Sequence, residues 1–332
     1  MKAAVFRGPR DVQLEEVEKP TLEEGEVLLR VRACGICGSD LHTYRHGMFQ
    51  EVLGLPTETG CILGHEFSGE VAEVRGDVAG VEVGDRVVTV SSGANAEFIK
   101  ISHPATELLM PFDESISFVE AATTEPLGTS LHAVNLADPK DREIHVIMGA
   151  GIIGLGVLQC IKSRSSAKTI VVDLSDKRLA MATELGADMT MNAGKTDVVL
   201  RMMGSGLLDL DVPLAGSVDA VYDCAGVTKS FEGTTVLQQA LSIVKEDGKV
   251  IIVAVFEKQP EIEWNLVVRK GIRLFGSWAW SPEELVQASR LISSGKIDRK
   301  PLISHTFPLE DAKQAYETQL QEEEAIKVVL TP

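Results

Sequence analysis

The chain has 332 residues, enough for about two domains and for a sizeable buried core. Its formal net charge of −17 argues against nucleic acid and anionic membranes as partners, because such a surface repels phosphate groups. The five cysteines are an odd number, which argues against a secreted disulfide framework and leaves thiols available for metal or redox chemistry.

Two apolar stretches are candidates for targeting or membrane segments. Both are too short for either role. Ala3–Phe6 is followed by Arg7 and cannot form the apolar core of a signal peptide. Val146–Leu158 contains four glycines and falls short of the roughly 20 apolar residues that span a bilayer. We therefore expect a cytoplasmic protein with no membrane partner.

Short apolar runs broken by glycine fill the first hundred residues. Their spacing favours a compact antiparallel β-unit over alternating strands and helices. The predicted strands are Ala3–Phe6, Val27–Ala33, Phe67–Val74, Arg86–Val90 and Ala96–Ile101.

From Ile144 onward, strand-like runs are separated by segments with helical periodicity. This alternation predicts a doubly wound parallel sheet in an α/β protein. The predicted strands are Ile144–Met148, Thr169–Asp173, Met189–Asn192, Val218–Cys224, Val250–Val255 and Ile272–Phe275.

The C-terminal part predicts two helices and a last strand. Ser281 can cap the first helix, with Pro282 in its first turn and Glu284 completing a capping box. The second helix is expected near Glu310–Gln319 and the strand at Ile326–Leu330. Because this tail is too small for a third domain, we expect it to rejoin the N-terminal β-unit.

A glycine-rich segment follows the predicted strand Ile144–Met148 and opens an apolar helix. This is the context of the G-x-G-x-x-G dinucleotide fingerprint, in which the backbone approaches the pyrophosphate at a helix N-terminus. The candidate contacts to the coenzyme in it are Gly149, Gly151, Ile152, Ile153 and Gly154.

Asp173 ends the next predicted strand, 19 residues after Gly154. This is close to the spacing of about 20 expected for the acid that binds the adenosine ribose hydroxyls. Because a carboxylate repels a 2′-phosphate, we expect NAD as the coenzyme in preference to NADP. Lys177 and Arg178 lie close by, and Arg178 could weaken that preference.

Cys34 and Cys37 form a Cys-x-x-Cys pair, which suggests a zinc ribbon or a redox site. A four-thiolate zinc site needs a second such pair, but the other cysteines stand singly. A thioredoxin-like pair is expected in a redox fold at the start of a helix, whereas this one follows a predicted strand. Cys37, His65 and Glu66 instead offer thiolate, imidazole and carboxylate, the ligand types of a catalytic zinc ion.

A set of motifs in a fixed order carries a family resemblance across nearly the whole chain. They are Cys34-Gly35-Ile36-Cys37-Gly38-Ser39-Asp40-Leu41-His42, Leu63-Gly64-His65-Glu66-Phe67-Ser68-Gly69, Gly84-Asp85-Arg86-Val87, Glu125-Pro126-Leu127, the glycine fingerprint and Asp223-Cys224-Ala225-Gly226. The chain resembles the zinc-containing medium-chain dehydrogenase/reductase superfamily, and its polyol branch of sorbitol and 2,3-butanediol dehydrogenases looks nearest.

The resemblance implies a GroES-like, β-rich catalytic domain at residues 1–127 and 274–332, and a Rossmann NAD-binding domain at 128–273. It implies a zinc-dependent enzyme that transfers hydride from a secondary alcohol or diol to NAD⁺, reversibly, to give a ketone. The NAD-binding domains of the family commonly pair, so we expect a homodimer or homotetramer.

The resemblance also assigns roles at the metal. Cys37, His65 and Glu66 match the catalytic zinc ligands, and Glu125 matches a carboxylate at the metal that can exchange with Glu66. Cys34 matches a cysteine that is not a ligand.

Further roles concern the proton and the coenzyme. Ser39 and His42 match a relay that carries the alcohol proton through the nicotinamide ribose to solvent, a task suited to histidine because it titrates near neutral pH. Zinc is expected to act as the Lewis acid that favours the alkoxide. Cys224 and Ala225 lie in a segment that matches one that binds the coenzyme in the family.

The sequence departs from the family at one place. Many relatives insert a lobe with four closely spaced cysteines that bind a structural zinc after Gly-Asp-Arg-Val. Here only Val88–Ala94 separates Val87 from the next predicted strand, and no cysteine lies between Cys61 and Cys160. We expect one catalytic zinc per subunit and no structural zinc.

The resemblance implies a small-molecule alcohol or ketone as the substrate. The segment that borders the cleft in the family carries an arginine and a tyrosine in sorbitol dehydrogenases, where this chain has Ala279 and Trp280. That difference favours a less polar alcohol over a sugar. Trp278 and Trp280 are candidate pocket residues or interface residues, and Tyr44 and Phe49 are further pocket candidates.

Two other functions compete with this prediction. A zinc-free quinone or enoyl reductase would share the fold but lack the cysteine, histidine and glutamate pattern. A non-catalytic nucleotide-binding protein would keep the fold without needing a ligand set and a relay.

Overall fold

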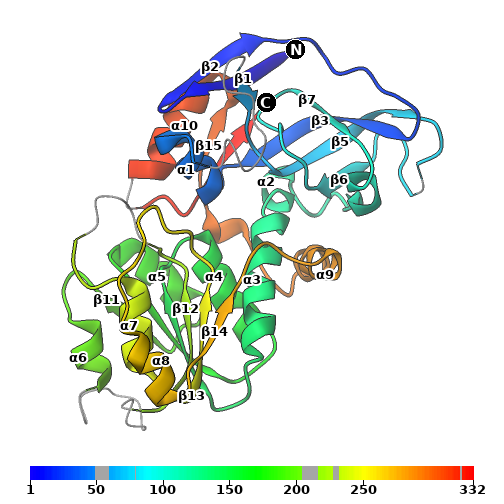
Figure 1. Cartoon of the computed structure of the whole chain (residues 1–332). Helices are drawn as coiled ribbons and strands as arrows, with labels where there is room; N and C mark the ends of the chain where they lie inside the picture. Colours follow the sequence, from blue (N-terminus) through cyan, green and yellow to red (C-terminus); the bar gives the residue numbers. More distant parts are fainter. Residues whose placement is uncertain (49–59, 79, 204–215, 227–231, 322–323) are drawn as a thin grey trace. The chain divides into compact units, whose positions relative to one another are not determined.

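The computed structural model describes residues 1–48, 60–78, 80–203, 216–226, 232–321 and 324–332. The chain divides into two units, Met1–Pro126 with Pro282–Pro332, and Leu127–Ser281. Both chain ends belong to the first unit (Figure 1). The boundary expected at 273/274 lies too early, because β14 (Arg273–Gly276) pairs with β13 (Val244–Ile252) in the sheet of the second unit.

The first unit is organised around β3 (Glu26–Gly35). This strand pairs antiparallel with β5 (Glu66–Arg75), β7 (Phe98–Ile101) and β16 (Lys327–Thr331). The sheet runs in the order β15-β16-β3-β5-β6-β8 among the described residues. Its other strands are β6 (Arg86–Thr89), β8 (Met110–Pro111) and β15 (Ile303–Pro308).

A smaller sheet stands beside it in the same unit. It has the order β2 (Asp11–Glu16), β1 (Lys2–Gly8) and β4 (Cys61–Ile62), all antiparallel. An antiparallel bridge between Ala3 and Ala96 links β1 to the segment before β7. The antiparallel β-unit predicted for the first hundred residues is therefore confirmed.

The last strand closes the first unit, as predicted for the C-terminal tail. In the ladder between β16 and β3, Val329 lies opposite Gly35 and Leu330 lies opposite Cys34. Inward-facing side chains of β3 enter one apolar core, and Val27, Leu29 and Val31 are almost completely buried there. The tail is thus part of the framework that carries the site described below.

Helices of the first unit come from both ends of the chain. The helix predicted after Ser281 begins at Pro282, and the second predicted helix is shifted by two residues at each end. The helices are α1 (Gly38–His46), α2 (Phe118–Ala121), α9 (Pro282–Ser293) and α10 (Ala312–Gln321), with short 3₁₀ turns at Ala105–Leu108, Lys300–Leu302 and Leu309–Asp311.

The second unit contains a parallel sheet in the order β11-β10-β9-β12-β13-β14. Its buried, apolar strands are typical of a sheet covered by helices on both faces, the arrangement seen in Figure 1. The remaining strands are β9 (Ile144–Met148), β10 (Lys168–Asp173), β11 (Met189–Asn192) and β12 (Val218–Asp223). The predicted Rossmann-type α/β fold is confirmed.

Six helices accompany this sheet within the described residues. α3 (Thr124–Ala137) leads into β9, and α4 (Ile152–Lys162) follows it. The others are α5 (Asp176–Glu184), α6 (Val198–Met203), α7 (Val236–Ile243) and α8 (Trp264–Lys270). No helix among the described residues is long and apolar enough to cross a membrane.

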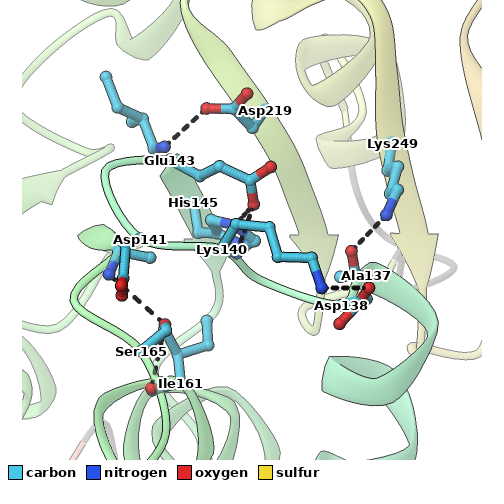
Figure 2. A network of polar contacts seen from close by, with 12 residues as sticks. Ala137, Asp138, Lys140, Asp141, Glu143, His145, Ile161, Ser165, Asp219 and Lys249 are labelled. Atoms are coloured by element: carbon cyan, nitrogen blue, oxygen red, sulfur yellow. Dashed lines mark hydrogen bonds and ion pairs between the residues drawn. The ribbon is translucent and has the colours of Figure 1, made fainter.

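A buried polar network lies at the amino ends of β9 and β12 (Figure 2). The His145 ring is fully buried, with Nδ1 3.1 Å from the Tyr222 hydroxyl and Nε2 3.0 Å from Glu143 Oε2. Asp219 accepts a hydrogen bond from the Ile144 backbone and pairs with Lys245. Every member named here has its partner inside the unit.

Candidate active site

The thiol of Cys37 stands at the turn between β3 and α1. Cys37 is the N-cap of the helix and has an extended backbone (φ −85°, ψ 158°). The Asp40 carboxylate accepts a 3.0 Å hydrogen bond from the Cys37 backbone N–H, which fixes this first turn. A helix N-terminus favours negative charge, so the position suits a thiolate.

His65 and Glu66 arrive from the start of β5. In the β3–β5 ladder Glu66 lies opposite Gly35, two residues before Cys37. Gly64 has a φ of +91°, and a Cβ there would lie 2.5 Å from Asn95 Oδ1 and 2.7 Å from the Cys34 sulfur. The chain therefore needs glycine immediately before His65 to enter the strand at this point.

Three potential metal ligands converge here. The ligand atoms of Cys37, His65 and Glu66 all lie within 4.8 Å of one another, which makes them the one such group found among the described residues. Cys37 and His65 are partly exposed and Glu66 is buried. Sulfur, nitrogen and oxygen donors gathered in this way fit zinc, and a set of three leaves a position open for substrate.

The charges of the site also fit a cation. Burial raises the pKa of the Cys37 thiol, and the Glu66 carboxylate raises it further. Burial lowers the pKa of His65, but Cys37, Asp40 and Glu125 outweigh it and the net pKa is raised. Each group must release its proton to bind a metal, so a divalent cation would take the place of protons held by an anionic cluster.

Two carboxylates stand behind the ligands. Asp40 Oδ1 lies 3.7 Å from His65 Nδ1, where it can orient the imidazole ring. Glu125 is buried in the first turn of α3, and its charge acts on His65. Glu125 is thus near the cluster, as expected from the sequence, although it is not a member of the three-ligand group.

The proposed relay residues lie on α1, directly after Cys37. Ser39 and His42 occupy its first and second turns, and both are partly buried. The Ser39 carbonyl accepts a hydrogen bond from the Thr43 hydroxyl, so the turn that carries Ser39 is held in place. Their relay role remains a prediction.

The glycine fingerprint forms a tight turn between β9 and α4 in the second unit. Gly149 has a φ of +105°, and Gly151 is the N-cap of α4. A Cβ on Gly154 would lie 1.8 Å from the Gly149 carbonyl oxygen, so only glycine fits there. Ile152 and Ile153 form the first turn of α4, at the positive end of the helix dipole.

Asp173 lies beside this turn. Its carboxylate accepts hydrogen bonds from the Ala150 backbone N–H at 2.6 Å and from the Ser175 backbone N–H at 2.9 Å. Arg178 lies in the first turn of α5, where its own backbone N–H is capped by Ser175. The acid predicted to bind the ribose is therefore joined to the fingerprint turn.

Cys224 and Ala225 follow β12 directly, at the carboxyl ends of the parallel strands. The Cys224 backbone N–H donates to Met148, and a Cβ on Gly149 would lie 3.0 Å from the Cys224 carbonyl carbon. The Asp223 carboxylate holds the backbone N–H groups of Ala225 and Gly226 at 3.2 and 3.0 Å. The predicted coenzyme segments thus meet at the carboxyl ends of the parallel strands, where open α/β sheets bind ligands.

The candidate pocket residues differ in exposure. Tyr44 is fully buried, its ring packs on Tyr316 and its hydroxyl donates to Glu317 at 2.7 Å. This placement argues against Tyr44 as a pocket residue, because the Tyr316 ring and the partly exposed Glu317 carboxylate already occupy the side chain. Trp278 is 68% exposed and Trp280 is partly exposed, while Phe49 lies outside the described residues.

Asp40 and Lys327 belong to this site but are not among the residues predicted from the sequence. Asp40 follows Cys37 by three residues, a capping spacing that could have revealed it. Lys327 is fully buried and its ammonium group pairs with Glu66. A lysine inside the apolar strand Ile326–Leu330 is the signal that could have found it.

Comparison with known proteins agrees with these features. Residues 23–107 match the alcohol dehydrogenase GroES-like domain, and residues 153–294 match the zinc-binding dehydrogenase family. The chain is 29% identical to the (R,R)-butanediol dehydrogenase of Bacillus subtilis (strain 168), covering 100% of both chains. It is also 29% identical to the sorbitol dehydrogenase of that organism, covering 100% of this chain and 97% of the relative.

Solved structures give the same picture. The 2R,3R-butanediol dehydrogenase of Bacillus subtilis superposes with a TM-score of 0.84 at 28% identity, covering 100% of this chain and 99% of that one. A putative zinc-binding dehydrogenase of Sinorhizobium meliloti 1021, bound to NADP, has a TM-score of 0.85 at 25% identity with the same coverage.

The two matched domains, the full-length relatives and the GroES-like and Rossmann-type units show that the chain belongs to the zinc-type alcohol dehydrogenase superfamily of oxidoreductases that act on CH–OH groups.

Proposed function

We propose that this protein oxidises a secondary alcohol or diol to the ketone with NAD⁺, reversibly, at a zinc ion held by Cys37, His65 and Glu66. The convergence of their three ligand atoms within 4.8 Å carries the proposal. The relatives named butanediol and sorbitol dehydrogenase support the alcohol class.

The protein's own groups prepare the site. Asp40 would orient the imidazole of His65, and Glu125, whose charge acts on His65, would be the carboxylate able to replace Glu66 as a zinc ligand. A bound zinc would supply Lewis-acid stabilisation of the alkoxide, worth several kcal/mol. These groups set the ligand geometry but leave the alcohol proton to be removed by others.

The relay on α1 would remove that proton. Ser39 Oγ would accept it from the substrate hydroxyl and pass its own proton to the nicotinamide ribose, and the His42 ring would take a proton from the ribose and deliver it to solvent. The placement of both side chains within five residues of Cys37 supports this assignment.

NAD is the proposed coenzyme. Asp173 stands next to the fingerprint turn through its bond to Ala150, where its negative charge opposes a 2′-phosphate. Arg178, in the first turn of the following helix, acts in the other direction. The comparison of kcat/KM for NAD⁺ and NADP⁺ tests this, and a clear preference for NADP⁺ contradicts the role of Asp173.

We propose one zinc per subunit. The connection Val90–Glu97 between β6 and β7 is short and contains no cysteine, so it offers no four-thiolate site. Metal analysis of the purified protein should give one zinc per chain, and two would contradict the proposal.

The proposed substrate is less polar than a sugar. Ala279 and Trp280 stand where sorbitol dehydrogenases are expected to carry hydroxyl-binding residues, and Trp278 lies directly before them. Short secondary alcohols and vicinal diols should therefore give higher kcat/KM than hexitols.

A homodimer is the proposed minimal assembly, with a tetramer as the larger alternative. β14 ends the parallel sheet, and an edge strand can pair with a second copy. Trp264 and Val268 on α8, the helix that precedes β14 in the chain, expose 65% and 79% of their surface, which adds exposed apolar area to this unit. Light scattering should find at least two chains per particle, and a monomer would contradict the proposal.

A panel of secondary alcohols and diols tests the activity directly. The purified protein should form NADH with at least one of them, lose that activity when zinc is removed and regain it when zinc is returned. A zinc-free protein with full activity, or a zinc-loaded protein that only reduces C=C bonds, contradicts the proposed function.

A further inference from the structure

We infer that Lys327 is a positioning residue that limits how strongly Glu66 binds the metal, and so keeps a coordination position available for substrate. The inference rests on the proposed zinc at Cys37, His65 and Glu66. It concerns a residue of the C-terminal strand, about 290 positions away from the turn of Cys37 in the sequence.

Lys327 is buried in an unusual way for a lysine. Its side chain has no exposed surface, and it is the one buried lysine among the described residues. The ammonium group contacts Glu66 Oε2 and donates a 2.8 Å hydrogen bond to the Ile36 carbonyl. A buried ammonium group without an anionic partner is strongly disfavoured, so Lys327 holds Glu66 in place.

The backbone is shaped around this pair. A Cβ on Gly35 would lie 2.6 Å from Glu66 Oε2 and 2.7 Å from Lys327 Cε. Only a glycine at the end of β3 leaves room for the lysine chain to reach the carboxylate. The ladder between β16 and β3 then fixes the position of the lysine relative to Cys37.

With zinc bound, Glu66 would therefore face two cations. One of its oxygens faces Lys327, while a ligand oxygen of the same carboxylate lies within 4.8 Å of those of Cys37 and His65. The ammonium charge lowers the negative charge that Glu66 can offer to zinc, and it also repels zinc directly. Both effects weaken the bond between Glu66 and the metal without changing any ligand.

Lys327→Gln tests the inference, because it removes the charge while keeping a donor for the Ile36 carbonyl. We expect zinc to leave this variant at least about tenfold more slowly in the presence of a chromogenic chelator, because repulsion is lost and Glu66 is free to bind. The absorption spectrum of the Co²⁺-substituted protein should shift relative to the wild type. Lys327→Arg, which keeps the charge, should restore wild-type release and a wild-type spectrum.

Lys2→Gln is the matched control. Lys2 also pairs with a glutamate, Glu310, but both side chains are about half exposed. This variant should release zinc at the wild-type rate. Equal or faster release from Lys327→Gln than from wild type would overturn the inference, and a wild type that binds no zinc would overturn the proposed function instead.

If Lys327→Gln does not fold, the comparison of Glu66→Gln with the double variant Glu66→Gln/Lys327→Gln keeps the test open. The double variant removes both charges of the buried pair, which proteins often tolerate. It should release zinc more slowly than Glu66→Gln, in which the ammonium repels the metal without compensation. Equal or faster release from the double variant would overturn the inference.

Discussion

Two buried polar clusters, one in each unit, differ in how their charges are balanced. Around His145 each group has its partner in the protein, namely Glu143, Tyr222 and the backbone. Around His65 the thiol of Cys37 and several carboxylates outnumber the cations. Burial, together with the charge of Glu66, raises the pKa values of Cys37 and Asp40, and the anions around His65 outweigh burial and raise its pKa. A polar cluster that is complete in itself is structural, whereas one that lacks a cation is a binding site.

The most direct test of this difference is to remove a ligand from the cluster around His65. Cys37→Ser should lose zinc and lower kcat/KM at least about thousandfold, because a hydroxyl is a poor zinc ligand and Lewis-acid assistance is lost. Metal analysis and NADH formation measure the two losses. An active, zinc-free Cys37→Ser protein with a normal circular dichroism spectrum would remove the proposed mechanism.

Much of the fold behind this prediction could be read from the sequence. The boundaries of β9 and β11 agree with the prediction. The clearest signal is that of β9, a buried parallel strand with an almost continuous apolar run. Asp11–Glu16 was not predicted as a strand, since its polar residues give no such run. β13 begins at Val244, earlier than predicted, because Lys245, Glu246 and Asp247 interrupt its apolar pattern.

The site was predictable to a similar degree. Cys37, His65 and Glu66 come together as their chemistry suggested, because β3 and β5 are neighbours in the sheet. Lys327 required knowledge of the pairing between β16 and β3, which depends on contacts distant in sequence. Tyr44 is a pocket candidate in the sequence, but its burial is set by contacts with Tyr316 and Glu317 of α10, which are distant in sequence.

Asp40 offers a milder change in the same cluster. Asp40→Asn should lower zinc affinity by about 10- to 100-fold, because the amide orients His65 less strongly and adds no negative charge. Competition with a chelator measures the affinity. Asp11→Asn, at a partly exposed position of β2, is the control and should leave the affinity unchanged.

His42→Ala separates the proton path from the metal. Turnover should slow by about tenfold or more, because general acid–base transfer is lost, while zinc content stays at the wild-type level. A loss of zinc together with activity would assign His42 to the metal cluster and remove it from the relay.

The smallest effect is expected in the complete cluster. Burial lowers the pKa of His145, so the folded protein stays neutral there while the unfolded chain takes up a proton below about pH 6.5. The unfolded state then binds more protons, and the free energy of unfolding should fall as pH decreases.

Urea unfolding at pH 8 and pH 5.5 measures how much His145 contributes to the fall in the free energy of unfolding. His145→Gln should show a smaller loss between the two pH values than the wild type, and zinc content should be the same in both proteins. An equal loss in the variant would show that His145 does not contribute to the acid sensitivity.

The pairing of β16 with β3 has a consequence for how the protein is made. Lys327 emerges from the ribosome long after Ile36, to which it bonds across 291 positions of sequence. The second unit, Leu127–Ser281, can fold while the first still lacks its central partner strand. During synthesis the nucleotide-binding half is thus complete first, and the ligand cluster acquires its counter-charge only in the closing step of assembly.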